Sequence, residues 1–519
     1  MSTNSREAKA SEYGTEKDVE VVAYTTTEDH DIIDFEEKKD LKRGLGQRHI
    51  QMIALAGTIG TGLFLGSGKA IARGGPVGAL LGYAFVGVLV SCVVFCQAEL
   101  AALVPLSGAI VRHAEYFFDP ALSFAMGWNY VYSNCVSLPA EITAGAVLIQ
   151  FWSSISNGLW ITILGILLII SNLLFVRVYG ELEFGFAILK IMLVVGLIIM
   201  GLVAGPDHHR YGFQYWRNPG PFVQYLNIEG SLGRFLGFWT TFSNAAYSYS
   251  GIETVANAAA ETQNPRRNIP LAAKRVFWRV LIFYVLGILI VGLIVPSNDP
   301  NLLGGSGNAS QSPFVIAATR AGISVVPHII NAIVLTSAWS AGNSIMLNGS
   351  RNLYGIAREG HAPKIFLRVN RFGVPYVAVS FLAAFMALAY MTLQDSASTV
   401  FQWFQVWIII CLVYLRFYYG MKKQGISRDE LPWKSPFQPY AAWLGFFAFC
   451  LILLTGGYSP TSTFPLIFAL YFSYKFITKS KLVPLDEMPI RKYIEIANQN
   501  PEPPAKPVKG LKRFNLLWS

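Results

Sequence analysis

The chain has 519 residues, of which 53% are hydrophobic and only 14% are charged, and its formal net charge is +10. A soluble chain of this length would be expected to form two or three domains, whereas here long apolar runs follow one another between residues 51 and 476. The charged residues gather in the tails and short connections, so the positive charge reflects membrane topology and does not indicate nucleic-acid binding. The sequence offers no Walker loop, nucleophile–base pair or metal-ligand spacing. This argues against an enzyme, an ATP-driven pump and a metalloprotein, and no cofactor is expected.

Runs of roughly 18 apolar residues are long enough to cross a bilayer as helices, and a helix satisfies its own backbone hydrogen bonds there. The sequence therefore predicts an all-α integral membrane protein with about 12 transmembrane helices. In chain order the predicted spans are 50–71, 77–103, 122–151, 160–176, 184–203, 235–256, 277–295, 323–345, 376–393, 400–419, 441–458 and 464–477.

The positions of the basic residues give the orientation. Most of the 41 lysines and arginines lie on the same side as the N-terminus, and the positive-inside rule assigns that side to the cytoplasm. We therefore expect two cytoplasmic tails, at 1–48 and 479–519, around a transmembrane domain at 49–478. The N-terminal tail has no apolar core, so no cleavable signal peptide is expected. Asn308 begins a glycosylation pattern in a predicted outside loop and is a candidate glycan site.

The first predicted span is interrupted by three close glycines, Gly57, Gly60 and Gly62. Each glycine inside a helix costs roughly 1 kcal/mol relative to alanine, although small residues also allow close helix packing. The sixth span has a second interruption of small and polar residues at 245–251. Because the two spans are five apart, they run in opposite directions. Corresponding interruptions in two inverted halves point to the binding site of a secondary transporter.

A helix broken at the bilayer midplane exposes N–H groups where its second half begins and C=O groups where its first half ends. A zwitterion satisfies both, so an α-amino acid is the predicted substrate. We expect the N–H groups of 60–62 to bind its carboxylate, and the carbonyls near 56–57 and 246–248 to bind its ammonium. Neighbouring tyrosines would select the side chain. The predicted substrate-binding residues are Ala56, Gly57, Thr58, Gly60, Thr61, Gly62, Tyr247, Ser248, Tyr249 and Gly251.

Four ionisable residues fall in or near the spans: Glu99, Glu141, Lys190 and Glu253. A charge at the bilayer centre costs about 3 kcal/mol, so each needs a role. Lys190 suits a proton-coupled cycle, with a structural ion pair as the alternative. Glu141 faces the pocket or a polar network, Glu253 braces the interrupted segment or relays a proton, and Glu99 anchors the membrane interface. We take Lys190, Glu141 and Glu253 as the candidate proton-coupling residues.

Several stretches of the chain are distinctive enough to compare with known families. They include GLGQRHIQMIALAGTIGTGLFLGSG (44–68), AELAALVPLSGA (98–109), SLPAEITAGAVLIQFW (137–152), SYSGIETVANAAAETQNPRRNIPLA (248–272), SAGNSIMLNGSRNLYGIAREGHAPKIF (340–366) and DELPWKSPFQPY (429–440). Together they resemble the fungal branch of the amino acid permeases, in the amino acid–polyamine–organocation superfamily. The resemblance runs from about residue 42 to residue 486.

This resemblance implies an inverted five-plus-five (LeuT-like) fold with broken helices 1 and 6 and two further helices. It also implies proton-coupled amino acid uptake at the plasma membrane. It maps the carboxylate site onto Gly60, Thr61 and Gly62 and the second break onto 248–251. Lys190 matches the lysine that occupies a cation-site position in related carriers. The expected partners are the amino acid, protons and the lipid bilayer, with ubiquitin and trafficking machinery as candidates at the tails.

Three features depart from the family pattern. The family normally has more residues between Gln405 and Trp407, so the tenth span at 400–419 is barely long enough here. The sequence before Phe464 is also contracted, which leaves a short twelfth span. Misplaced exon boundaries or genuine divergence would each explain these contractions. The tail ends at Ser519, where many relatives have a cysteine that can be acylated, so that anchor is not expected.

The leading hypothesis is a secondary active transporter that imports neutral amino acids, or a broad range of them, together with protons. An amino acid sensor with little transport is one alternative, although such a sensor would be expected to carry a longer cytoplasmic domain. A transport-dead variant, caused by the contractions in helices 10 and 12, is the other.

Overall fold

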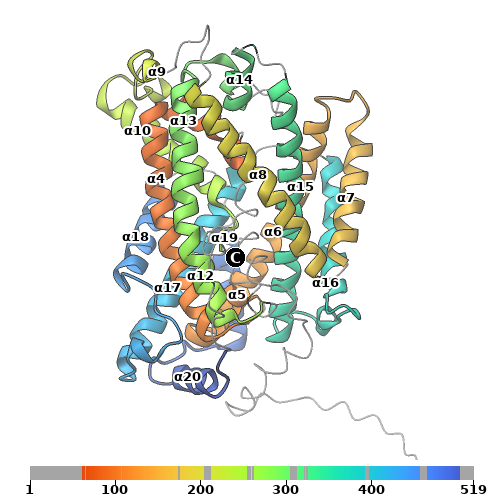
Figure 1. Ribbon diagram of the computed structural model, residues 1–519. Coiled ribbons are helices and arrows are strands. Elements are labelled where there is room, and N and C mark those ends of the chain that lie inside the picture. The colour runs from red at the N-terminus through yellow and green to blue at the C-terminus, as the bar shows by residue number, and fades with distance from the viewer. Residues whose placement is uncertain are drawn as a thin grey trace, which may run out of the picture.

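The structure is a computed structural model and describes residues 61–64, 66–106, 108–173, 176–203, 212–253, 259, 262–303, 312–320, 322, 325–391, 397–455 and 464–502. Within these ranges it contains helices and no strand. The long helices run side by side through the bundle (Figure 1), as the apolar runs of the sequence predict. Several begin at a proline, such as Pro120, Pro265 and Pro313, because proline is favoured in the first turn of a helix.

The long elements follow the predicted spans closely. They are α4 (Gly66–Leu103), α6 (Pro120–Ile149), α7 (Asn157–Leu173), α8 (Val176–Val203), α10 (Gly230–Tyr249), α12 (Pro265–Arg279), α13 (Leu286–Ile294), α15 (Val325–Arg358), α16 (Tyr376–Phe385), α17 (Ala397–Lys423), α18 (Tyr440–Thr455) and α19 (Phe464–Thr478). A π-helical turn at Val280–Val285 joins α12 to α13, and a 3-10 turn at Met386–Met391 extends α16. The shorter helices are α3 (Thr61–Phe64), α5 (Ala109–Phe117), α9 (Gln214–Arg217), α14 (Pro313–Arg320) and α20 (Ile490–Gln499).

Five helical stretches within the described ranges are long and apolar enough to cross a membrane: 66–103, 181–199, 265–294, 325–358 and 404–423. The helices at 157–173, 376–391, 440–455 and 466–478 are apolar but shorter. Every predicted span from the second onward therefore coincides with a helix or helical run. Most of the first predicted span lies outside the described residues.

Two predicted spans end differently in the structure. The eighth was expected at 323–345, but α15 continues as a helix through the polar residues after this span, as far as Arg358. The tenth was expected to be barely long enough, but α17 has 27 residues, about 40 Å at the rise of an α-helix. The twelfth is as short as expected, since α19 has 15 residues.

The helices form two groups by their mutual contacts. The first helix group consists of α4, α10, α12 and α13, and the second helix group consists of α6, α7, α15 and α16. Helices α8 and α17 each contact members of both groups, and α8 crosses the bundle obliquely (Figure 1). Close packing within the first group depends on small residues. A Cβ atom on Gly82 of α4 would lie 1.9 Å from Oγ1 of Thr241 on α10, so only glycine allows this approach.

Candidate functional site

Gly62, the last glycine of the first predicted interruption, meets the second interruption in space. Helix α10 ends at Tyr249, where Ser250 leaves helical geometry with φ −57° and ψ 143°, and Gly251 follows at φ +84°. Gly62, in the short helix α3, packs against this end. A Cβ atom on Gly62 would lie 2.8 Å from Cα of Ser248 and 3.1 Å from Cδ1 of Tyr247. The remaining residues of the first interruption, Ala56, Gly57, Thr58 and Gly60, lie outside the described residues, as does Asn308.

Three buried tyrosines hold the end of α10 in place. The hydroxyl of Tyr83 lies 2.9 Å from Oγ of Ser248, and Tyr249 donates its hydroxyl proton to the carbonyl oxygen of Tyr83 at 3.0 Å. Tyr284, which the π-helical turn after α12 presents, donates to the carbonyl oxygen of Ser248 at 3.1 Å. The broken end of α10 is therefore fixed by contacts within the first helix group.

These contacts change how two of the predicted residues are assigned. The carbonyl of Ser248 accepts from Tyr284, and the carbonyl of Tyr247 accepts from Oγ of Ser250 at 2.8 Å. The carbonyl of Tyr247 also accepts from the backbone N–H of Ser250 at 3.3 Å, so both of its lone pairs are used. A carbonyl oxygen has two lone pairs, and that of Ser248 accepts one hydrogen bond among the described residues. Tyr249 is fully buried, and its ring lies between those of Tyr83 and Tyr284. Tyr249 therefore supports the break, whereas Tyr247 is half-buried against Gly62.

Lys190 lies on α8 with no exposed surface. Its Nζ donates to Oγ of Ser340 on α15 at 3.1 Å. Its electrostatic neighbours are Glu183, two turns earlier on α8, and Glu141 on α6. The lysine thus interacts electrostatically with two carboxylates that come from different helices, as expected for a buried cation.

Glu183 is the functional candidate that the sequence analysis missed. It is fully buried, and its Oε2 accepts from Oγ of Ser340 at 2.7 Å, so the same hydroxyl links it to Lys190. Its other oxygen, Oε1, is buried without a hydrogen-bond partner among the described residues, and Oδ1 of the neighbouring Asn343 accepts from Ser171 of α7 at 2.8 Å. The predicted fifth span begins one residue after Glu183, which is why this carboxylate was not counted as intramembrane. Its spacing of seven residues from Lys190, two turns along one helix face, is the signal that points to it.

Glu141 follows Pro139 in the middle of α6, as predicted. Its side chain is half-buried, and Lys190 is its electrostatic neighbour. One of its oxygens, Oε2, is buried and has no hydrogen-bond partner among the described residues. A buried oxygen without a partner is unfavourable for an ionised carboxylate, so this site can accommodate the protonated form of Glu141.

Glu253 comes directly after the interruption and is 1% exposed. Its Oε1 accepts from the hydroxyl of Tyr130 on α6 at 3.2 Å, and its Oε2 accepts from Nε1 of Trp407 on α17 at 3.1 Å. Both oxygens are thus held by neutral donors from two other helices. This arrangement satisfies an ionised carboxylate and fits the bracing role more closely than a proton relay.

Glu99 lies near the end of α4, on the side predicted to be cytoplasmic. It accepts from Arg428 at 2.7 Å and from the backbone N–H of Ser435 at 2.6 Å. The carboxylate therefore ties α4 to the connection between α17 and α18. This agrees with the anchoring role expected from its position.

The fold and the sequence both have known counterparts. The structure resembles that of a Na⁺-coupled sialic acid symporter in a substrate-bound outward-open state, with a TM-score of 0.53 and 13% identity, covering 82% of this chain and 94% of the symporter. The chain is 42% identical over 447 residues to a proline-specific permease of Emericella nidulans, covering 82% of this chain and 81% of the relative. It is 37% identical over 501 residues to a dicarboxylic amino acid permease of Saccharomyces cerevisiae, covering 90% and 82%.

A sequence profile described as amino acid permease matches residues 49–483. That range contains both interruptions, the Lys190 site and every long helix of the bundle. The matched relatives are membrane transporters and not enzymes, in line with the absence of a catalytic constellation in the sequence. The chain belongs to the amino acid permease family.

Proposed function

We propose that this protein is a secondary active transporter that imports amino acids across the plasma membrane together with protons. The observation that carries the proposal is the contact of Gly62, at the end of the first predicted interruption, with Ser248 at the broken end of α10. Two half-helices that end at one point present backbone donors and acceptors to the same ligand. An amino acid zwitterion matches both sets.

In this proposal the backbone N–H groups at the start of α3, from Gly60 to Gly62, hold the substrate carboxylate. The carbonyls of Ala56 and Gly57, and those at 246–248, hold the ammonium. Thr58 and Tyr247 are the proposed side-chain contacts of the substrate, while Ser248, Tyr249 and Gly251 maintain the geometry of the broken end of α10. The side chain of the substrate then meets residues of other helices, which decide the substrate range.

The proton would act at the Lys190 site. Lys190 supplies a fixed positive charge between Glu183 and Glu141. Glu183 is fully buried and shares the hydroxyl of Ser340 with Lys190, whereas Glu141 is half-buried. One oxygen of each carboxylate, Oε1 of Glu183 and Oε2 of Glu141, lacks a hydrogen-bond partner among the described residues. Two carboxylates in such different surroundings take different roles. In this proposal Glu183 stays the counter-ion of the lysine, and Glu141 takes up and releases the coupled proton. Glu253 contributes by bracing the segment after the break.

The proposed architecture has about 12 spans, ten of them in an inverted five-plus-five repeat with two further helices. Its transmembrane domain covers 49–478, and both tails, 1–48 and 479–519, are cytoplasmic. The rocking motion expected of such repeats would move the first helix group against the second. The short helix α19 lies outside the proposed ten-helix core. The full length of α17, which reaches Glu253 through Trp407, supports an active carrier over a transport-dead form.

The substrate range is proposed to be neutral or broad. The two named relatives differ in the amino acids that their names state, proline in one and dicarboxylic amino acids in the other. The shared backbone site therefore does not fix the side chain that is accepted.

The direct test is uptake of radiolabelled amino acids by cells that lack their own amino acid permeases, at several external pH values. We expect saturable uptake that increases as the external pH falls. Gly62→Ala should reduce it at least about tenfold, because the new Cβ atom would lie 2.8 Å from Cα of Ser248. Gly66→Ala is the matched control, since its nearest neighbour would lie at 4.0 Å. If no amino acid gives saturable, pH-dependent uptake, the proposal is wrong.

A further inference from the structure

The residues after α19 fold back against the bundle. Ser480 donates its hydroxyl proton to Oδ1 of Asp119 at 2.9 Å, and the backbone N–H of Val483 donates to the carbonyl of Phe118 at 2.9 Å. Asp119 is the N-cap of α6 and also accepts from Tyr471 and Lys475 of α19. The segment is thus fastened first to the junction between α5 and α6.

The same segment is then held by α17. Nε2 of Gln424 donates to the carbonyls of Leu485 and Met488, each at 2.9 Å. Gly420 lies so close that a Cβ atom there would be 2.5 Å from Sδ of Met488. Arg416 also donates to the carbonyl of Val483. Side-chain donors that satisfy the backbone of an irregular segment fix its path along α17.

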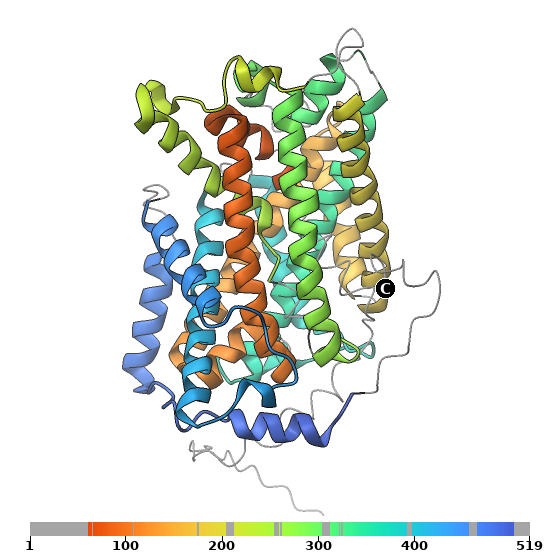
Figure 2. The same cartoon turned by 60° about the vertical axis from the view of Figure 1, so that its left-hand side comes forward.

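Helix α20 continues the segment across the end of the bundle that the charge distribution assigns to the cytoplasm, where it lies crosswise to the long helices (Figure 2). Its apolar residues Ile490, Tyr493, Ile494 and Ala497 are buried, and they recur at the spacing of one helix face. The ring of Tyr493 packs against Tyr116 of α5, with centroids 5.9 Å apart. Glu495 lies on the exposed face of α20.

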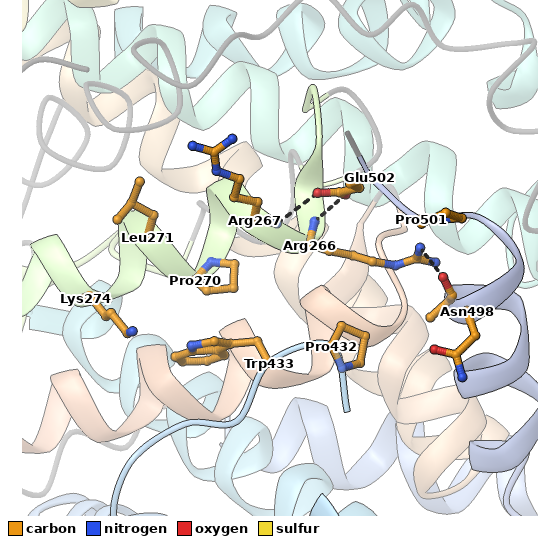
Figure 3. Close-up of a pocket in the computed structure, with 11 residues that line it drawn as sticks. Arg266, Arg267, Pro270, Leu271, Lys274, Pro432, Trp433, Asn498, Pro501 and Glu502 are labelled. Carbon is orange, nitrogen blue, oxygen red and sulfur yellow. Dashed lines mark hydrogen bonds between the residues drawn. The ribbon is translucent and has the colours of Figure 1, made fainter. Parts of the chain in front are cut away.

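The segment ends on α12. The carboxylate of Glu502 accepts from the backbone N–H groups of Arg266 and Arg267, at 2.8 and 3.2 Å, in the first turn of α12. In return, the guanidinium of Arg266 donates to the carbonyls of Ala497 and Asn500, at 3.1 and 2.7 Å. Figure 3 shows this reciprocal contact beside the cavity of about 680 Å³ that Lys274 and Trp433 also line. A carboxylate at this position satisfies the unpaired N–H groups of the helix and matches its dipole.

These contacts join elements that would have to separate. Helices α5 and α6 contact each other, and α6 belongs to the second helix group, whereas α12 belongs to the first. Opening a path toward the cytoplasm by rocking one group against the other would move α12 away from α5 and α6. The segment 479–502 bridges them.

We propose that residues 479–502, which we name the C-terminal clamp, restrain the opening of the permease toward the cytoplasm, and that Glu502 on α12 is the contact that releases. The surface formed by α5, α17 and α12 is the docking site for this segment of the same chain. Glu502 is the natural point of release because it is the last contact and the only one that the clamp makes through a carboxylate among the described residues. This inference rests on the proposed transport cycle.

The test measures distance and does not require uptake, so it stays informative if the proposed substrate or coupling is wrong. Spin labels are placed at Lys274, exposed on α12, and at Lys364, exposed beside α15 and α16, on full-length protein whose native cysteines are replaced. Glu502→Ala should increase the population with the longer distance about fivefold. Glu495→Ala, which removes the same charge from the exposed face of α20, should leave the distances unchanged.

A second variant covers the case in which Glu502→Ala alone changes the distances too little to be detected. A chain that ends after Gln499 removes Asn500 and Glu502, so that of these contacts with α12 only the one between Arg266 and the carbonyl of Ala497 remains, and it should show the same shift or a larger one. Unchanged distances in both Glu502→Ala and the shortened chain would overturn the proposal. So would an equal shift in Glu495→Ala, because the effect would then come from net charge and not from the docked carboxylate.

Discussion

Two clusters of buried polar side chains lie between the helix groups, and they are built differently. In the Lys190 cluster a cation sits between Glu183 and Glu141. In the Glu253 cluster a single carboxylate is held by Tyr130 and Trp407. Both connect α6 with other parts of the bundle, and both contain acidic residues with almost no exposed surface at Glu183 and Glu253.

The difference lies in what a change of protonation would do. The Glu253 carboxylate has neutral donors on both oxygens, so its ionised form is satisfied without a cation, and the cluster acts as a fixed brace. The Lys190 cluster holds three ionisable groups, and each of its two carboxylates, Glu141 and Glu183, has one buried oxygen without a hydrogen-bond partner among the described residues, which allows the charge of the cluster to change. A buried pair that loses one member is strongly destabilised, which couples the state of this cluster to the packing around it. The same Glu→Gln substitution in each cluster tests this distinction.

The largest effect is expected for Glu183→Gln. The variant keeps the shape of the side chain but removes the fixed counter-ion of Lys190, and breaking a buried ion pair costs about 3–5 kcal/mol. We expect uptake to fall about 100-fold and to depend less steeply on external pH, measured as initial rates normalised to the amount of protein at the cell surface. Glu181→Gln, on the same helix, is the control. A normal rate with a normal pH profile would mean that Glu183 is not part of the coupling site.

A smaller effect is expected for Glu253→Gln. The amide still accepts one hydrogen bond, but its NH₂ group faces a donor from Tyr130 or Trp407, which costs about 1–3 kcal/mol. Uptake should fall roughly tenfold while its pH profile keeps the wild-type shape, and Trp407→Phe should have a similar result. If the pH profile changes as it does in Glu183→Gln, the two clusters do not differ in the way described above.

The smallest effect is expected for Tyr284→Phe, which removes the donor to the carbonyl of Ser248. A lost neutral hydrogen bond is worth about 1 kcal/mol, so we expect KM to change by about threefold with little effect on the pH profile. Substrate titrations of the uptake rate measure it. An unchanged KM would show that the hydrogen bond between Tyr284 and this carbonyl does not affect substrate binding.

The sequence by itself determined where the described helices lie and where α10 is interrupted. Apolar periodicity is a local property, so predicted spans such as 122–151 and 160–176 coincide closely with α6 and α7. The glycines of the first interruption and the small residues at 245–251 likewise carry their signal in neighbouring positions. Lys190 was found because a charge inside an apolar run is conspicuous without any knowledge of its partners.

Only the tertiary structure decided which side chains meet. Ser340 lies 157 positions from Glu183, and Trp407 lies 154 positions from Glu253. No local pattern links such residues, because their contact depends on how the helices pack and rotate against one another. Packing also placed the carbonyl of Ser248 against Tyr284, and it brought Glu502 to the first turn of α12. Helix formation is set by neighbouring residues in the chain, whereas pairing across helices is set by the shape of the whole bundle.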